Sequence, residues 1–121
     1  MGKSAESFQD LAVWQKAHQL VLSIYSVTKD FPADERFGLV SQMRRAGVSI
    51  AANIAEGFKK RGIKDKCNYY NIAQGSLEES RYYLILAKDL GYLAANDELL
   101  KNCDEVGKML HGLVTSVVSR Q

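Results

Sequence analysis

The sequence predicts an all-α fold, an antiparallel up-and-down four-helix bundle. Only one of the 121 residues is proline, so little in the chain interrupts a helix. Apolar residues recur at three- and four-residue spacing through four long segments, the period of an amphipathic helix. These segments are about 20 residues long and are joined by short connections, as in bundles of consecutive antiparallel helices. A chain of this length forms one domain, so residues 1–121 are treated as a single four-helix-bundle domain.

The first helix is expected over residues 9–29. Its main apolar row is Leu11, Trp14, His18, Val21, Tyr25 and Thr28. A second row widens this face and consists of Val13, Ala17, Leu20, Ile24 and Val27. Pro32 ends the segment, because the residue before a proline is disfavoured in the α region. The second helix is then expected over residues 35–58.

The second helix carries a polar stripe opposite its apolar face. Its members are spaced i, i+3, i+7, i+11 and i+14, which is one side of a helix, and they are Gln42, Arg45, Ser49, Asn53 and Glu56. Serine and asparagine are mediocre helix formers, so a face that is merely wet is better served by Lys, Glu and Gln. Two interpretations remain open. The stripe is either ordinary surface or a buried or interfacial network in which Arg45 pairs with a carboxylate such as Glu78.

The third and fourth helices are expected over residues 63–90 and 96–118. The basic turn with Gly62 separates the second helix from the third, and Gly91 is a natural stop for the third. Asn96 is a suitable N-cap for the fourth helix. The acidic pair that follows it, Asp97 and Glu98, suits the positive end of the helix dipole.

The charge of the chain is small overall but unevenly distributed. The net charge is +2, yet residues 36–66 hold eight basic residues against two acidic ones, or +6. The rest of the chain has eight basic and twelve acidic residues, or −4. Such an asymmetry indicates an anionic partner.

The basic segment supplies the candidate nucleic-acid contacts. They are Arg44, Arg45, Lys59, Lys60, Arg61, Lys64 and Lys66. Tyr69 and Tyr70 follow one turn later, where their rings are candidates for stacking on bases. The alternative is a solvated basic loop with both tyrosines packed inside the bundle.

No residue pattern points to catalysis, so the chain is not expected to be an enzyme. His18 and His111 lack partners at metal-ligand spacing, and no Glu-x-x-His pair of the di-iron bundles occurs. Glu78 and Glu79 are adjacent, so on a helix they point about 100° apart and cannot act as a dyad. No Gly-rich phosphate cradle or nucleophile motif is present. We therefore expect neither a metal nor a cofactor.

Other features bear on location and redox state. No apolar run reaches the roughly 20 residues that span a bilayer, and the first residues lack the apolar core of a signal peptide. These features predict a cytoplasmic protein without membrane attachment. Cys67 and Cys103 are then expected to be separate thiols, with a disulfide as the alternative.

The apolar surface exceeds what one core stripe per helix requires. Tyr82, Ile85 and Leu86 lie off the core stripe of the third helix, and more than half the circumference of the first helix is apolar. This excess favours self-association over scattered surface hydrophobic residues.

Several motifs are similar to those of a known family. In this chain they are Phe8-Gln9-Asp10-Leu11-Ala12-Val13-Trp14, Phe31-Pro32, Gly38-Leu39-Val40-Ser41-Gln42-Met43-Arg44-Arg45-Ala46, Asn53-Ile54-Ala55-Glu56-Gly57 and Gly75-Ser76-Leu77-Glu78-Glu79. In this order and at this spacing they resemble the 23S ribosomal RNA intervening-sequence protein family. The resemblance runs from Phe8 to about Leu93, whereas the fourth helix matches in pattern alone.

The resemblance implies a small bacterial four-helix bundle that forms a homopentameric ring. Similar bundles are accessory proteins of diversity-generating retroelements, in which a basic pentamer binds RNA and the reverse transcriptase. No catalytic residues are known for the family. The motif positions carried over are structural, and they are Trp14, Gln42, Arg45, Asn53, Glu56 and Glu78. This chain departs from the retroelement members in being only weakly basic.

The leading hypothesis is therefore a non-enzymatic, homo-oligomeric bundle that binds RNA. The runner-up is a protein-interaction scaffold, for example a partner of a reverse transcriptase or of another protein. A bundle that binds a small molecule is a third possibility.

Overall fold

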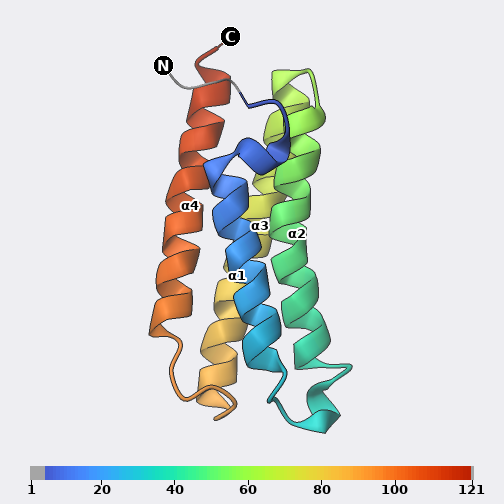
Figure 1. The fold of residues 1–121 in the computed structure, drawn as a ribbon, viewed down its shortest axis with the longest axis vertical. Coiled ribbons are helices and arrows are strands. Elements are labelled where there is room, and N and C mark those ends of the chain that lie inside the picture. Colours follow the sequence, from blue (N-terminus) through green and yellow to red (C-terminus); the bar gives the residue numbers. More distant parts are fainter. Residues whose placement is uncertain (1–4, 121) are drawn as a thin grey trace.

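A computed structural model describes residues 5–120 as an antiparallel bundle of four α-helices. The helices are α1 (Ala12–Thr28), α2 (Leu39–Lys59), α3 (Ile63–Asp89) and α4 (Asp97–Val118), with short 3₁₀ helices η1 (Phe8–Asp10) before α1 and η2 (Ala33–Glu35) before α2. Successive helices run up and down the long axis (Figure 1). The predicted fold class is confirmed.

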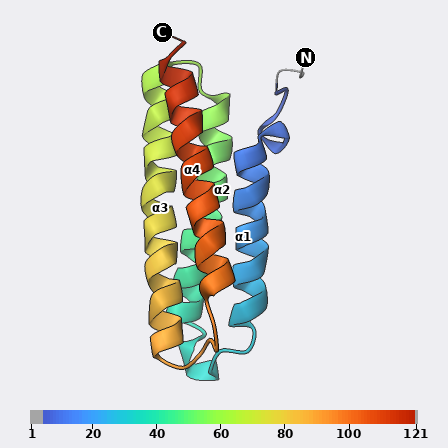
Figure 2. The same cartoon turned by 90° about the vertical axis from the view of Figure 1, so that its left-hand side faces the viewer.

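Helices consecutive in sequence pack against each other, and α4 closes the bundle against α1. Figure 2 shows α4 in front, between α1 and α3, with α2 behind. The α2–α3 turn and the end of α4 lie at one end of the molecule, whereas η2 and the α3–α4 connection lie at the other (Figure 1). Segments far apart in the sequence therefore meet at each end.

Helices α1 and α2 begin later than predicted, at residue 12 rather than 9 and at residue 39 rather than 35. Before α1, the Asp10 carboxylate accepts the N–H groups of Glu6 and Ser7 at 2.9 and 3.2 Å, which closes η1 and leaves Leu11 extended. Before α2, the Glu35 carboxylate accepts the Leu39 N–H at 3.2 Å. In both places a carboxylate that looked helical in the sequence instead holds a short turn.

The far ends of the helices lie close to the predicted ones. Helix α3 ends at Asp89, and Gly91 follows with φ of 81°, the left-handed conformation that glycine adopts without strain. Asn96 precedes α4 but makes no side-chain cap. Its amide instead donates to the Leu84 carbonyl at 3.1 Å and ties the start of α4 to α3.

The predicted main row of α1 was right only for Val21 and Thr28, because the helix is rotated from the expected orientation. The buried residues are Val13, Ala17, Leu20, Val21, Ile24 and Thr28. Tyr25 is 40% exposed, and Trp14 and His18 are half-buried. The row expected only to widen the face is central, because α1 lies between α2 and α4 and turns its smaller residues inward.

Helices α2 and α3 are in close contact at Gly57 and Tyr70. A Cβ atom at position 57 would lie 2.6 Å from Cε1 of Tyr70, so glycine is required for the present spacing. Tyr70 is buried, and its ring occupies the space beside Gly57. Ala73, Ser76 and Ser80 continue the small, buried surface of α3.

Both cysteines are free thiols, as predicted. Cys103 is fully buried in the core. Burial is the main cause that raises the pKa of the Cys103 thiol from 9.0 to about 11. The folded protein thus binds this proton more tightly than the unfolded chain does.

The raised pKa of Cys103 predicts that the folded protein loses stability at alkaline pH. The pKa of the Cys103 thiol is higher in the folded protein than in the unfolded chain. Its contribution to the free energy of unfolding is therefore complete below pH 9 and disappears as the pH rises to about 11. The expected loss is on the order of 2–3 kcal/mol. Urea unfolding of wild type and Cys103→Ala across this range measures it, because the difference in stability between them should shrink. A pH-independent difference would contradict the prediction.

Candidate nucleic-acid interface and polar network

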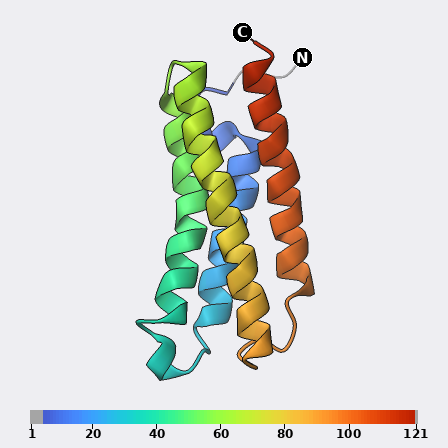
Figure 3. The ribbon, with the colours of Figure 1, turned by 180° about the vertical axis from the view of Figure 1, so that it is seen from behind.

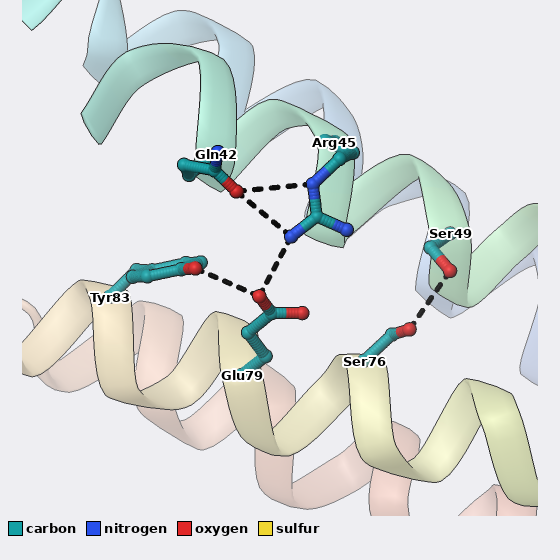
Figure 4. Close-up of polar contacts among 6 residues, drawn as sticks. All are labelled: Gln42, Arg45, Ser49, Ser76, Glu79 and Tyr83. Carbon is teal, nitrogen blue, oxygen red and sulfur yellow. Dashed lines mark hydrogen bonds and ion pairs between the residues drawn. The ribbon is translucent and has the colours of Figure 1, made fainter. Parts of the chain in front are cut away.

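Arg45 is the centre of a polar network between α2 and α3. Its Nε and Nη2 atoms donate to Oε1 of Gln42 at 3.1 and 3.0 Å. Nη2 also donates to Oε2 of Glu79 at 2.7 Å, and the Tyr83 hydroxyl donates to the same oxygen at 2.8 Å (Figure 4). The hydrogen bond from Tyr83 to Glu79 is the main cause that raises the pKa of Tyr83.

A second group of polar bonds lies further along the same helix pair. The hydroxyls of Ser49 and Ser76 are 2.8 Å apart across the interface (Figure 4). The Asn53 amide donates to the Ser49 carbonyl at 2.8 Å and to its hydroxyl at 3.0 Å. The polar stripe thus makes specific contacts with α3.

Two expected members of the network, Glu78 and Glu56, do not take part. Glu78 pairs with Arg81 at 3.3 Å, and Arg81 also bonds Asp104 of α4 at 2.6 Å. Glu79 takes the place foreseen for Glu78, because adjacent residues point about 100° apart on a helix. Glu56 is exposed and makes no hydrogen bond or ion pair within residues 5–120.

The network fixes the register of α2 against α3 more than it stabilises the fold. The side chains of Arg45 and Glu79 remain 54% and 36% exposed, so water screens their attraction. Exposed pairs of this kind contribute about 0–1 kcal/mol. Half-buried Ser49 adds a directional bond to Ser76 of α3 that a slipped helix would lose, whereas the bonds of Asn53 to Ser49 lie within α2.

The α2–α3 turn forms the positively charged end of the bundle. Lys59, Arg61 and Lys64 are exposed, and Lys60 is half-buried. Arg120, just after α4, joins them in space. Burial is the main cause that lowers the pKa of Lys66, and the positive charge of Arg120 is the second cause. We call Lys59, Lys60, Arg61, Lys64, Lys66 and Arg120 the basic end.

Sequence reasoning missed Arg120 because it lies outside the basic segment. Only the fold brings the end of α4 beside the α2–α3 turn (Figure 1). The up-and-down topology was a sufficient signal, since it places the ends of α2 and α4 together.

Two lysines of the basic end also have structural roles. The Lys66 ammonium donates to the carbonyls of Gly57 and Phe58 at 3.2 and 2.7 Å, which closes the C-terminus of α2. The Lys60 ammonium lies 5.2 Å from the centre of the Tyr69 ring. Tyr70 is buried, so neither tyrosine presents a bare ring to a base.

Arg44 and Arg45 do not join the basic end. They lie roughly 20 Å from Lys59 along α2, at 1.5 Å per residue. The Arg44 Nε donates to the Thr28 hydroxyl at 3.0 Å, and its guanidinium lies 4.5 Å from the centre of the Tyr25 ring. Arg44 thus ties α2 to α1, as Arg45 ties α2 to α3.

The two histidines occupy different surroundings. His18 stacks on Trp14 with ring centres 4.9 Å apart, whereas His111 is exposed on α4. Within residues 5–120, no three His, Cys, Asp or Glu side chains gather as metal ligands. None of the helices described there combines the length and the apolar character needed to cross a membrane.

These features define the class of protein: a small up-and-down helical bundle with a positively charged end and several exposed apolar side chains. The chain belongs to the 23S rRNA-intervening sequence protein family, whose pattern matches residues 9–112. The resemblance found in its motifs is thereby confirmed.

One similar solved structure is a protein of unknown function from the S23 ribosomal protein family of Bacteroides thetaiotaomicron. The two chains are 25% identical and superpose with a TM-score of 0.78 over 85% of this chain and 98% of the other. No curated protein matches this chain.

Proposed function

We propose that this protein is a non-enzymatic RNA-binding bundle that assembles with copies of itself into a ring. The basic end is the observation that carries the proposal. Lys59, Arg61 and Lys64 are exposed there beside Arg120. RNA is proposed as the anion because the retroelement accessory bundles that this chain resembles bind RNA.

Binding at the basic end depends on phosphates. Ammonium and guanidinium groups that contact RNA release condensed counterions, so affinity falls as salt rises. One bundle offers few such groups. A ring with its basic ends on one face multiplies them, which compensates for a net charge of only +2.

Exposed apolar side chains support self-association. Leu22 and Val48 lie on α1 and α2, while Ile72, Tyr82 and Ile85 lie on α3. An apolar groove of about 370 Å³ also runs between α1 and α2, lined mainly by Trp14, His18, Val21, Val48, Ala52 and Ala55. Such surfaces mark protein contacts. Five copies per ring is the stoichiometry we propose from the family resemblance.

Charge reversal at the basic end is expected to weaken RNA binding by at least about tenfold. The variant combines Lys59→Glu, Arg61→Glu and Lys64→Glu, none of which has a structural contact described above. The matched control combines Lys88→Glu, Lys101→Glu and Lys108→Glu, exposed lysines elsewhere. Mobility shifts with a structured RNA across a salt series measure both affinity and salt slope.

Both variants change the net charge equally. The control therefore shows whether RNA binds at the basic end or responds only to the overall charge of the protein. Equal losses in the two variants would refute the basic end as the site. Absent or salt-insensitive binding by the wild type would refute RNA binding itself. Co-purification of a protein without nucleic-acid absorbance would then favour the scaffold function.

A further inference from the structure

Phe37 is the most exposed large apolar side chain among residues 5–120, at 87%. It lies between η2 and α2, at the end of the bundle opposite the basic end (Figure 1). The guanidinium of Arg36 lies 5.3 Å from the centre of its ring. The fold therefore displays an aromatic ring with a cation beside it.

The segment that carries Phe37 is held in place on both sides. The Glu35 carboxylate accepts the Leu39 N–H at 3.2 Å and the Tyr92 hydroxyl at 2.9 Å. Tyr92 also packs on Phe31, with ring centres 5.4 Å apart. Because this segment is already ordered, a contact through Phe37 loses less conformational entropy than one through a loose loop.

A complementary surface lies on the outer side of α3. Glu78, Tyr82, Ile85 and Asp89 are spaced i, i+4, i+7 and i+11, so they form one stripe. Tyr82 and Ile85 are 57% and 41% exposed, and the two acids are exposed at either end of the stripe. The stripe lies in the C-terminal half of α3, towards the same end of the bundle as η2 (Figure 3).

We propose that Phe37 of one copy packs against Tyr82 and Ile85 of a second copy of this chain. Arg36 of the first copy then lies towards the exposed carboxylate of Asp89, one turn after Ile85, whereas Glu78 already pairs with Arg81. Charge complementarity argues for this occupant, because an aromatic ring beside a cation meets an exposed apolar pair that an exposed acid, Asp89, follows one turn later. The inference rests on the self-association proposed above and names its surfaces.

The two surfaces differ, so the contact is heterologous. A copy that uses its Phe37 on one neighbour leaves its α3 stripe free for the next. Repetition of such a contact closes a ring when its rotation divides a full turn, and otherwise builds an open filament. Both surfaces lie towards the same end of the bundle (Figure 3), so side-by-side copies run parallel and their basic ends share one face.

Light scattering at micromolar concentration gives the first test. Phe37→Ser is expected to reduce the mass of the assembly towards the 13.5 kDa of one chain. Val118→Ser, an exposed apolar side chain at the other end, should keep the wild-type mass. Circular dichroism checks that both variants remain helical. An unchanged mass for Phe37→Ser overturns the inference.

Cysteine cross-linking gives the second test and identifies the pairing. The background is Cys67→Ser, while buried Cys103 is retained. Phe37→Cys with Tyr82→Cys in one chain should give a ladder of covalent oligomers on oxidation. A mixture of the two single variants should give only dimers. Dimers from Phe37→Cys alone would instead show a symmetric contact and overturn the proposed pairing.

These outcomes separate the inference from the proposed function. A wild type that remains at 13.5 kDa refutes the ring and this contact together, whereas the salt-dependent RNA assay stands by itself. A wild-type assembly that survives Phe37→Ser keeps the ring and refutes only the contact.

Discussion

Ile54→Ala is expected to destabilise the fold by about 2–5 kcal/mol. Ile54 is completely buried on α2. Removing its methyl groups loses their transfer free energy and leaves a cavity that surrounding helices fill only in part. Urea unfolding followed by helical circular dichroism measures the loss.

Ile72→Ala is the matched control, since it deletes the same atoms from another helix. Ile72 is 51% exposed on α3, and alanine is the better helix former. Its effect should stay within about 0.5 kcal/mol, the range typical of surface changes. Equal losses for the two variants would mean that Ile54 does not occupy the core as described.

Gly57→Ala is expected to destabilise the protein by about 1–3 kcal/mol. The added Cβ would lie 2.6 and 2.9 Å from two ring carbons of Tyr70, and 3.1 Å from Cβ of Tyr69. Tyr70 is buried, so relieving these contacts requires α2 and α3 to separate. Alanine's helix propensity offsets up to about 1 kcal/mol of this cost. The same urea experiment measures it.

Gly75→Ala on α3 is the matched control, and it is expected to increase the stability of the protein. Apart from the neighbouring residues and the backbone of its own helix, no atom lies within 4 Å of a Cβ built there, so only the helix propensity changes. A gain of about 0.5–1 kcal/mol is expected. If both glycine variants were stabilised alike, the close approach of α2 and α3 at Gly57 would be refuted.

The sequence was sufficient to predict the fold class and the approximate helix ranges, because periodicity survives small local errors. It did not establish the rotation of each helix. On α1, large Trp14 and Tyr25 suggested the central row, yet smaller Val13 and Ala17 are buried instead. The same uncertainty exchanged Glu78 for Glu79 as the partner of Arg45. Neighbouring residues differ by one step of rotation, which only the packing of the other helices selects.

The candidate site was predicted in part. The basic turn is exposed in the structure, whereas Arg44, Arg45 and Lys66 are held by the protein itself. Charge counting along a chain does not distinguish a free cation from one that closes a helix. Nor does it reveal Arg120, whose position depends on how the helices return to the same end.

The close pairing of α2 and α3 has a consequence for how the chain folds. These helices are joined by the three residues between Lys59 and Ile63, so bringing them together closes a very short loop. The α1–α4 contact, with its 2.9 Å ion pair of Lys16 and Glu105, closes a loop of most of the chain. Closure entropy rises with loop length. We therefore expect the α2–α3 hairpin to be the folding nucleus, onto which α1 and α4 dock last.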